Sequence, residues 1–299
     1  MLIYCLEKPQ IKILSRFSKK FKFINIRKKI PTNAEILYIK LKHFIDKKII
    51  NKNSNLRFLL SPTTGTNHID LKMINENGIK LLNLNAKDKE IKTITSTGEY
   101  TLTLILAATR RLFDHFRNNS KFNKKNRYLF KIFQFQKYKV GIIGTGRIGT
   151  YLNRHLIKLD YQTITYDRKK DKLSKLKKLL VESDIISINI NANNNLNFID
   201  KKKLQLMKKN VIFINTSRGE VVNEKDLISF LRKNKSSSAF LDVIKNEQKN
   251  LRKNLLLEYQ KKNKNLTILP HLGGATVDAM EIADNYIFEK LIKEYEKKN

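Results

Sequence analysis

The sequence is poor in several features that would define a class of protein. Only one of its 299 residues is a cysteine, Cys5, which excludes a disulfide framework and a thiolate zinc site and favours a reducing compartment. No run approaches the ~20 consecutive apolar residues of a membrane span, and the first ten residues lack the basic start and apolar core of a secretory signal. We find no internal repeat and no Pro/Gly/Ser-rich linker, and we expect no metal site. These absences predict a cytoplasmic protein without a membrane partner.

Acidic residues are also scarce, at 27 against 61 Lys and Arg, which gives a formal net charge of +34. A charge of this size suggests binding to a polyanion. Lys, however, outnumbers Arg more than three to one and is spread along the chain, whereas proteins that read nucleic acid favour Arg where planar recognition matters. We interpret the charge as a solvated lysine surface and do not expect specific nucleic-acid binding, only weak, salt-sensitive adhesion.

Short apolar runs recur along the whole chain. Apolar residues make up 41% of the sequence, which excludes intrinsic disorder, and the length suits two domains. Several runs are apolar at nearly every position, as in parallel sheets covered on both faces by helices, and helix-length stretches such as Ile148–Leu159 lie between them. We predict a doubly wound α/β fold. The predicted strands are Glu35–Lys40, Arg57–Pro62, Lys80–Leu84, Lys139–Gly144, Thr163–Asp167, Asp184–Ile190, Val211–Thr216, Ser238–Val243 and Leu266–Pro270.

The pattern breaks once, between Arg110 and Tyr138, where strand character is lost and charge is gained. The break follows a predicted amphipathic helix at about Ser96–Leu112, and a last predicted helix covers about Ala275–Lys298. We place residues 1–110 and about 275–299 in a first, discontinuous domain, and residues 111–274 in a second.

A glycine-rich turn opens the second domain. Residues 144–149 read GTGRIG, after the predicted strand KVGII and before a predicted helix. In such a turn the first glycine permits the bend, the second lets the backbone approach a pyrophosphate, and the third lets helix and strand pack closely. Backbone N–H groups and the helix dipole then face the diphosphate. The residues expected at the diphosphate are Gly144, Gly146, Arg147, Ile148 and Gly149.

Asp167 ends the strand that follows the glycine turn. Its carboxylate is expected to accept hydrogen bonds from the adenosine ribose hydroxyls and to repel a 2′-phosphate. We therefore predict NAD as the cofactor, preferred over NADP. Arg168, Lys169 and Lys170 weaken that preference.

Five stretches carry a family resemblance: Ile214–Leu227, Phe240–Gln248 and Leu269–Met280 in the second domain, and Asn55–Leu71 and Ser96–Leu112 towards the N-terminus. In order and spacing they resemble the D-2-hydroxyacid dehydrogenase family over nearly the whole chain. The resemblance implies a Rossmann NAD-binding domain at 111–274 and a flavodoxin-like substrate domain at 1–110 plus about 275–299. It further implies a phosphoglycerate dehydrogenase-like enzyme that interconverts a D-2-hydroxy acid and its 2-oxo acid by hydride transfer, and a homodimer formed around residues 112–138.

The same resemblance assigns catalytic roles to Arg218, Glu247 and His271, and the chemistry of these residues agrees. A guanidinium fork can hold the carboxylate and carbonyl oxygens of a 2-oxo acid. An imidazole can take or give the hydroxyl proton, and a carboxylate can fix the imidazole.

Supporting roles also follow from the resemblance. Asp242 resembles the aspartate that contacts the nicotinamide carboxamide, although a structural role after the strand is the alternative. Asn189–Asn195 stands where the family has a His-x-Pro stretch. The remaining expected residues are Thr216, Ser217, Gly273 and Gly274 at the cofactor, and Thr64 and Gly65 at the substrate carboxylate.

A second hypothesis remains open. A non-catalytic, NAD-sensing or nucleic-acid-associated protein on the same fold would carry the glycine turn and the positive charge equally well. The set of Arg218, Glu247 and His271 argues against it, because a sensor does not need an acid–base pair.

Overall fold

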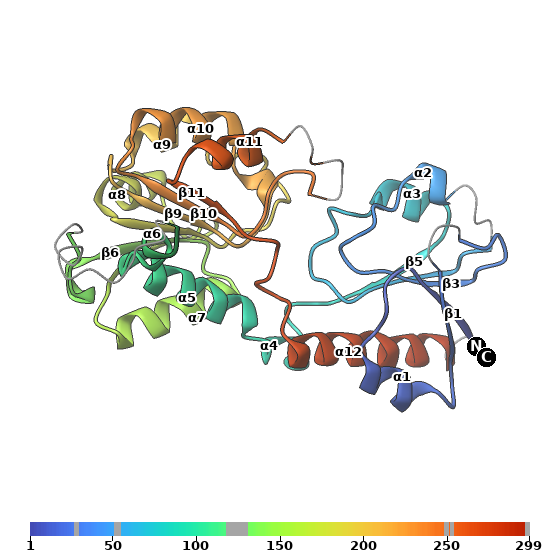
Figure 1. Cartoon of the computed structure of the whole chain (residues 1–299). Helices are drawn as coiled ribbons and strands as arrows, with labels where there is room; N and C mark the ends of the chain where they lie inside the picture. The colour runs from blue at the N-terminus through green and yellow to red at the C-terminus, as the bar shows by residue number, and fades with distance from the viewer. Residues whose placement is uncertain (27–29, 51–54, 118–130, 248–250, 252–253, 297–299) are drawn as a thin grey trace. The chain divides into compact units, whose positions relative to one another are not determined.

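The computed structural model describes residues 1–26, 30–50, 55–117, 131–247, 251 and 254–296, and the chain divides into two compact units (Figure 1). Unit 1 comprises Met1–Ile94 with Ala275–Asn299, and unit 2 comprises Thr95–Gly274. We expected residues 95–110 in the first domain, whereas the structure places helix α5 (Ser96–Thr109) in unit 2. The reason is packing, because Leu104 and Ile105 of α5 belong to the same apolar cluster as the strands of the unit 2 sheet.

Unit 1 is built on a parallel sheet in the order β2-β1-β3-β4-β5. This is the strand order of flavodoxin-like folds, with the switch in direction between the first and third strands. The three predicted strands of this region are confirmed, and two further strands were not predicted. The strands are β1 (Leu2–Cys5), β2 (Lys22–Asn25), β3 (Ile36–Tyr38), β4 (Phe58–Ser61) and β5 (Lys80–Asn83).

Helices cover both faces of the unit 1 sheet, and the last helix of the chain, α12, is one of them (Figure 1). Phe288 of α12 is fully buried and stacks on Tyr38, with ring centroids 5.6 Å apart. Buried Asp284 accepts hydrogen bonds from the Tyr38 hydroxyl at 2.5 Å and from the backbone N–H of Gln10 at 2.8 Å. The helices are α1 (Ile11–Phe17), α2 (Lys47–Ile50), α3 (Leu71–Glu76), α4 (Lys89–Lys92) and α12 (Val277–Glu296).

Unit 2 contains a parallel sheet in the order β11-β10-β9-β8-β6-β7. The chain leaves β6 for β7 on one side and returns to β8 on the other, so the switch point lies between β6 and β8. Ligands of doubly wound sheets bind at this place, outside the carboxyl ends of the strands. All six strands were predicted: β6 (Lys139–Ile143), β7 (Gln162–Tyr166), β8 (Ile185–Ile188), β9 (Ile212–Asn215), β10 (Ser238–Leu241) and β11 (Leu266–Ile268).

Two apolar clusters fill the faces of the unit 2 sheet. One contains side chains of α5 and α7, and the other contains side chains of α8, α9, α10 and α11. The predicted α/β fold with doubly wound parallel sheets is therefore confirmed. The helices not yet given are α6 (Leu112–Arg117), α7 (Arg147–Lys158), α8 (Leu173–Glu182), α9 (Lys201–Leu206), α10 (Glu224–Lys233) and α11 (Leu255–Lys262).

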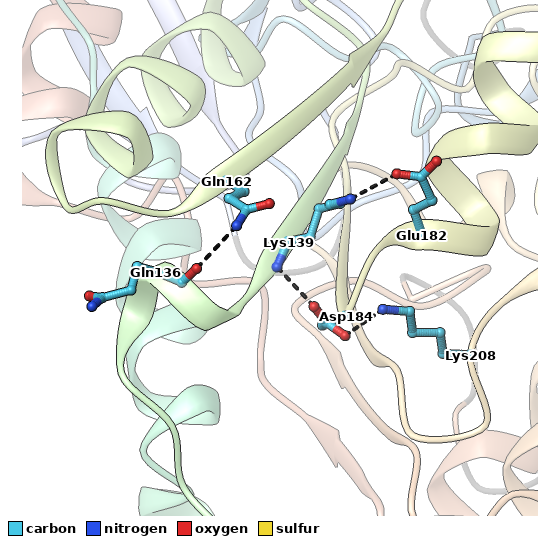
Figure 2. A network of polar contacts seen from close by, with 6 residues as sticks. All are labelled: Gln136, Lys139, Gln162, Glu182, Asp184 and Lys208. Carbon is cyan, nitrogen blue, oxygen red and sulfur yellow. Dashed lines mark hydrogen bonds and ion pairs between the residues drawn. The ribbon is translucent and has the colours of Figure 1, made fainter.

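The amino ends of these strands are joined by polar contacts (Figure 2). Asp184, just before β8, accepts a hydrogen bond from the backbone N–H of Lys139 at 2.9 Å and forms an ion pair with Lys208 Nζ at 2.7 Å. Lys139 Nζ pairs with Glu182 at 2.8 Å. Lys139, Glu182, Asp184 and Lys208 thus pair with one another at the amino edge of the sheet. Among the described residues, no helix is long and apolar enough to cross a membrane.

Candidate active site

The glycine turn lies at the switch point, between β6 and α7. Gly144 has φ +100°, and a Cβ there would lie 2.5 Å from the carbonyl oxygen of Asn189. A Cβ on Gly149 would lie 1.9 Å from the carbonyl oxygen of Gly144, so neither position accepts a side chain. Gly146, at the start of α7, instead faces open space. A helix N-terminus bordered by open space is suited to a phosphate group.

Asp167, directly after β7, is tied to this turn. Its carboxylate accepts hydrogen bonds from Thr145 Oγ1 at 2.5 Å and from the backbone N–H of Lys169 at 3.0 Å. These hydrogen bonds, together with the nearby lysine charges, hold the pKa of Asp167 below its usual range. Asp167 therefore presents an ionised carboxylate beside the turn.

A cavity of about 580 Å³ opens at the carboxyl ends of β6, β7 and β8. Its lining includes Gly146, Asp167 and most of the loop Asn189–Asn195. Arg168 Nη1 donates to the carbonyl oxygen of Asn194 at 2.9 Å. Oδ1 of Asn189 is buried and accepts no hydrogen bond from any described residue. A cavity with an ionised carboxylate beside the glycine turn fits the adenosine diphosphate part of NAD.

Arg218 follows β9 in a loop shaped by Asn215. The buried Asn215 side chain accepts hydrogen bonds from the N–H and Oγ of Ser217 at 3.0 and 2.8 Å and donates to the carbonyl oxygen of Arg218 at 2.9 Å. Arg218 Nη1 in turn donates to the carbonyl oxygen of Ser217 at 2.6 Å. Asn215 was not predicted as a site residue, although a polar residue at the end of an otherwise apolar strand was the available signal.

A close backbone approach brings the loops after β9 and β10 together. A Cβ on Gly219 would lie 2.0 Å from the carbonyl carbon of Ile244, so only glycine fits there. The β10 loop carries Glu247, whose negative charge acts on Arg218. Burial lowers the pKa of Arg218, and the charges of Glu247 and Glu220 oppose that change.

His271 and Glu247 are in direct contact. His271 Nδ1 lies 2.7 Å from Glu247 Oε1, and both side chains are about one-fifth exposed. The backbone of His271 is in the left-handed region, with φ +56°, a conformation that is costly for a non-glycine residue and that clusters at functional sites. The structure thus brings together Arg218, Glu247 and His271, which lie far apart in the sequence.

Asp242 holds the backbone that carries His271. The two carboxylate oxygens accept the N–H groups of Leu272 and Gly273, both at 2.8 Å, and the carbonyl oxygen of Asp242 accepts the N–H of His271 at 3.0 Å. Burial raises the pKa of Asp242. Burial also raises the pKa of Tyr100 to about 12, with contributions from the charge of Asp242 and a hydrogen bond to it. Asp242 therefore has a structural role in addition to any contact with a cofactor.

The remaining expected residues of unit 2 lie near α5. Thr216 Oγ1 is 2.7 Å from Thr101 Oγ1 of α5. A Cβ on Gly273 would lie 3.0 Å from Asp242 Oδ2 and 3.3 Å from Thr97 Cγ2, so the chain runs close to α5 directly after His271. The nearest atom to a Cβ on Gly274 would be Thr97 Oγ1, at 3.9 Å.

Thr64 and Gly65 belong to unit 1, in the loop after β4. The carbonyl oxygen of Gly65 accepts a hydrogen bond from Thr63 Oγ1 at 2.8 Å, and Thr64 is exposed. Within the described part of the chain, the backbone N–H groups of Thr64, Gly65 and Thr66 donate no hydrogen bond. Three such donors in one loop can bind an anion.

The glycine turn at the switch point, with an ionised carboxylate after the next strand, defines unit 2 as an NAD-binding unit of the dehydrogenase type. The family model described as D-isomer specific 2-hydroxyacid dehydrogenase, NAD binding domain, matches residues 102–273. The chain belongs to this family of NAD-dependent enzymes, and NAD is its cofactor.

Known proteins resemble the chain beyond that domain. Erythronate-4-phosphate dehydrogenase from Psychrobacter sp. (strain PRwf-1) is 27% identical over 275 residues, which cover 88% of this chain and 67% of that protein. D-lactate dehydrogenase from Aquifex aeolicus, solved with NAD and lactic acid, superimposes with a TM-score of 0.80 at 24% identity, covering 99% of this chain and 96% of that one. The apo-structure of D-lactate dehydrogenase from Escherichia coli gives a TM-score of 0.80 at 20% identity, with coverages of 99% and 97%. Both solved structures share the fold.

Proposed function

We propose that the protein interconverts a small 2-oxo acid and the corresponding D-2-hydroxy acid, with Arg218, Glu247 and His271 as its catalytic residues. The observation that supports this most directly is the 2.7 Å contact between His271 and Glu247. The guanidinium of Arg218 lies within reach of the same carboxylate charge. All three residues follow strands of the sheet that carries the glycine turn.

In this proposal Arg218 binds and orients the substrate. Its planar guanidinium can hold the carboxylate and the carbonyl oxygen together. The Asn215 side chain hydrogen-bonds to the backbone N–H of Ser217 and to the carbonyl of Arg218, and the Arg218 guanidinium hydrogen-bonds to the Ser217 carbonyl. Because burial destabilises the charge of Arg218, an anionic substrate is a favourable partner for it.

His271 moves the proton. NAD supplies the hydride acceptor, and NADH the hydride donor, when bound. Glu247 occupies Nδ1 of His271, so Nε2 is the nitrogen that exchanges a proton with the substrate oxygen. Asp242 positions His271 by accepting hydrogen bonds from the backbone N–H groups of His271 and Leu272.

The other residues bind the cofactor and the substrate carboxylate. The N–H groups at the start of α7 would bind the diphosphate, and the ionised Asp167 would bind the ribose. We propose that the N–H groups of the Thr64–Gly65 loop bind the substrate carboxylate. The proposed cofactor contacts are Gly144, Gly146, Arg147, Ile148, Gly149, Asp167, Thr216, Ser217, Asp242, Gly273 and Gly274.

As a finer proposal, the substrate is phosphorylated, as in a phosphoglycerate dehydrogenase-like enzyme. The curated relative from Psychrobacter is named for a phosphorylated acid, and the net charge of +34 favours anionic substrates. The solved neighbour from Aquifex is instead named for lactate. The test therefore compares phosphorylated with unphosphorylated 2-oxo acids.

The test is a panel of 2-oxo acids with and without a phosphate group, offered with NADH or NADPH while the loss of absorbance of the reduced cofactor is followed. We expect turnover with NADH, and a higher kcat/KM for phosphorylated acids. Higher kcat/KM for unphosphorylated acids would overturn the finer proposal. No turnover of any acid, with NAD still bound, would overturn the proposed function and favour an NAD-sensing protein.

We also propose that the protein is a homodimer, assembled around residues 112–138. Residues 118–130 of this segment lie outside the described residues. On either side of them, large apolar side chains are exposed, among them Phe116 at 78% and Phe133 at 55%, and a second copy would cover such a surface. Sedimentation of the wild type and of Phe133→Ser tests this, because the dimer should weaken in the variant. A monomeric wild type at micromolar concentration would overturn the proposal.

A further inference from the structure

A relay of side chains in unit 1 ends on the proposed carboxylate-binding loop. Ser61, the last residue of β4, is fully buried, and its Oγ lies 2.9 Å from Thr63 Oγ1 and 3.2 Å from His68 Nε2. Thr63 Oγ1 donates to the carbonyl oxygen of Gly65 at 2.8 Å. His68 is 1% exposed. The contacts therefore run from a buried imidazole to a backbone carbonyl at the tip of the loop.

Counting hydrogens fixes the direction of this relay. It has three contacts, while the hydroxyl groups of Ser61 and Thr63 supply one hydrogen each. Thr63 uses its hydrogen on the Gly65 carbonyl, so Ser61 must donate to Thr63, and the third hydrogen must come from His68. His68 therefore carries a proton on Nε2 and is the donor that starts the relay.

The last contact of the relay determines where the loop points its N–H groups. In a planar trans peptide the carbonyl of one residue and the N–H of the next point in opposite directions. Because the Gly65 carbonyl is bonded to Thr63, the N–H of Thr66 points away from Thr63. The N–H groups of Thr64, Gly65 and Thr66 donate to no group within the described residues. The direction of the Thr66 N–H at the loop tip thus depends on the relay.

Backbone contacts hold the rest of the loop independently. The N–H of Thr63 donates to the Ser61 carbonyl at 2.7 Å, and the Thr63 carbonyl accepts from the N–H of Leu84 at 3.1 Å. The His68 carbonyl accepts from the N–H of Ile45 at 2.8 Å. Changing the relay side chains leaves these bonds in place, so the effect should be confined to residues 64–66.

We propose that His68 is a positioning residue for the substrate carboxylate and acts through Ser61 and Thr63. It aligns the N–H groups of residues 64–66 before the substrate binds, which lowers the cost of ordering the loop on binding. This inference rests on the proposed function, since it takes the loop to bind a carboxylate. Without the relay, the loop tip must be ordered by the substrate itself.

Kinetics of four single variants test the proposal. His68→Leu removes one contact of the relay, whereas Ser61→Ala and Thr63→Val remove two each. His68→Gln retains an N–H donor on its side chain. We expect KM for the 2-oxo acid to rise about 3- to 10-fold in the first three, as for the loss of one neutral hydrogen bond, with kcat and the Kd of NADH unchanged. His68→Gln should recover part of the loss. The double variant His68→Leu/Ser61→Ala should lose no more than His68→Leu, because both break the same relay.

The matched control is Thr93→Val, which removes another unit 1 threonine hydroxyl that donates to a backbone carbonyl, that of Glu90. It should leave KM unchanged. Thermal unfolding shows whether each variant is folded at the assay temperature. KM unchanged in Ser61→Ala and Thr63→Val, or additive losses in the double variant, would overturn the proposal.

A binding measurement separates this inference from the proposed function. Amide chemical shifts of Thr64, Gly65 and Thr66 are followed in the full chain with NADH while oxamate, an unreactive carboxylate with a neighbouring carbonyl, is added. We expect these amides to shift in the wild type and to require more oxamate in His68→Leu. Amides that do not respond in the wild type would overturn the inference even if 2-oxo acids are reduced. A response that His68→Leu weakens would support it even if no acid in the panel is reduced.

Discussion

His271 and Glu247 lie 24 residues apart in the sequence, yet Nδ1 of the imidazole is 2.7 Å from Oε1 of the carboxylate. Asp242 holds the segment that carries the imidazole by accepting the backbone N–H groups of His271, Leu272 and Gly273. In the proposed function this contact leaves Nε2 of His271 for the substrate, and the first two predictions below test that role.

Replacing His271 by alanine should lower kcat by about 10²- to 10⁴-fold, the usual contribution of general acid–base catalysis. The Kd of NADH, measured by fluorescence, should change little, because the imidazole is proposed to act on the substrate. His155→Ala is the control, since His155 lies in the last turn of α7 and bonds to the carbonyl of Tyr151. An active His271→Ala variant would show that another group moves the proton.

Glu247 should act only through His271. Glu247→Ala is expected to lower kcat, because the imidazole loses the partner that fixes its orientation. In the double variant with His271→Ala the two losses should not add, as for residues that work as one unit. Single-turnover kinetics of the four proteins in the cycle measure this, and fully additive losses would mean that Glu247 has a separate role.

Arg218→Lys keeps the positive charge and removes the fork. We expect KM for the 2-oxo acid to rise about 10- to 100-fold, which corresponds to the loss of one charge-assisted hydrogen bond worth ~1.5–3 kcal/mol. Arg232→Lys, on the exposed side of α10, is the matched control and should behave as the wild type. Equal KM values for the wild type and Arg218→Lys would show that the guanidinium fork of Arg218 does not bind the substrate carboxylate.

Asp167→Asn should shift the choice of cofactor. The variant lacks the carboxylate that repels a 2′-phosphate, while Arg168 and Lys169 still line the cavity, so the Kd of NADPH should fall and that of NADH should rise. Isothermal titration with NADH and NADPH measures both constants. Asp160→Asn makes the same change at an exposed position after α7 and should alter neither constant. An unchanged ratio of the two constants in Asp167→Asn would contradict the ribose role.

Asp284 should make the stability of the fold depend on pH. Burial raises its pKa, although Lys40, Tyr38 and Gln10 partly oppose the change. As pH rises, the carboxyl of Asp284 ionises in the unfolded chain before it ionises in the folded one. The stabilisation that neutral Asp284 gives the fold is therefore fully present below about pH 4 and is lost as pH rises through the raised pKa. Asp284→Asn does not titrate, so the wild type should lose stability relative to the variant over this range. Urea unfolding at several pH values measures the difference, and parallel pH profiles would contradict the prediction.

The strands that the sequence failed to predict are those whose pattern is weakest. Lys22–Asn25 lies at the sheet edge and has no fully buried residue, so it lacks the apolar run that marks the central strands. Leu2–Cys5 has an exposed first residue and lies at the start of the sequence, where no preceding helical pattern marks it as a strand. The buried strands β6, β8 and β9, in contrast, were predicted because helices cover both of their faces, which requires apolar residues throughout.

The candidate site was predictable to the extent that its residues carry distinctive chemistry at the ends of strands. The contact between Glu247 and His271 agrees with that prediction. Asn215 was not singled out although it is the polar last residue of the apolar strand β9. His68 was assigned no role, because a single polar residue within a loop has no periodicity to mark it. The packing of α5 in unit 2 depends on contacts of Leu104 and Ile105 with residues far along the chain, and a local pattern does not contain such information.

The position of α12 has a consequence for synthesis of the protein on the ribosome. Unit 1 begins at the first residue, but its core needs Ala283, Ile287, Phe288 and Leu291 of α12, which are translated after all of unit 2. The first 94 residues therefore leave the ribosome without the helix that completes their core, and unit 2 is the first part of the chain whose whole core is available. A chain truncated after residue 274 would carry the whole of the NAD-binding unit and an N-terminal unit that lacks part of its core, whose exposed apolar face is a target for chaperones.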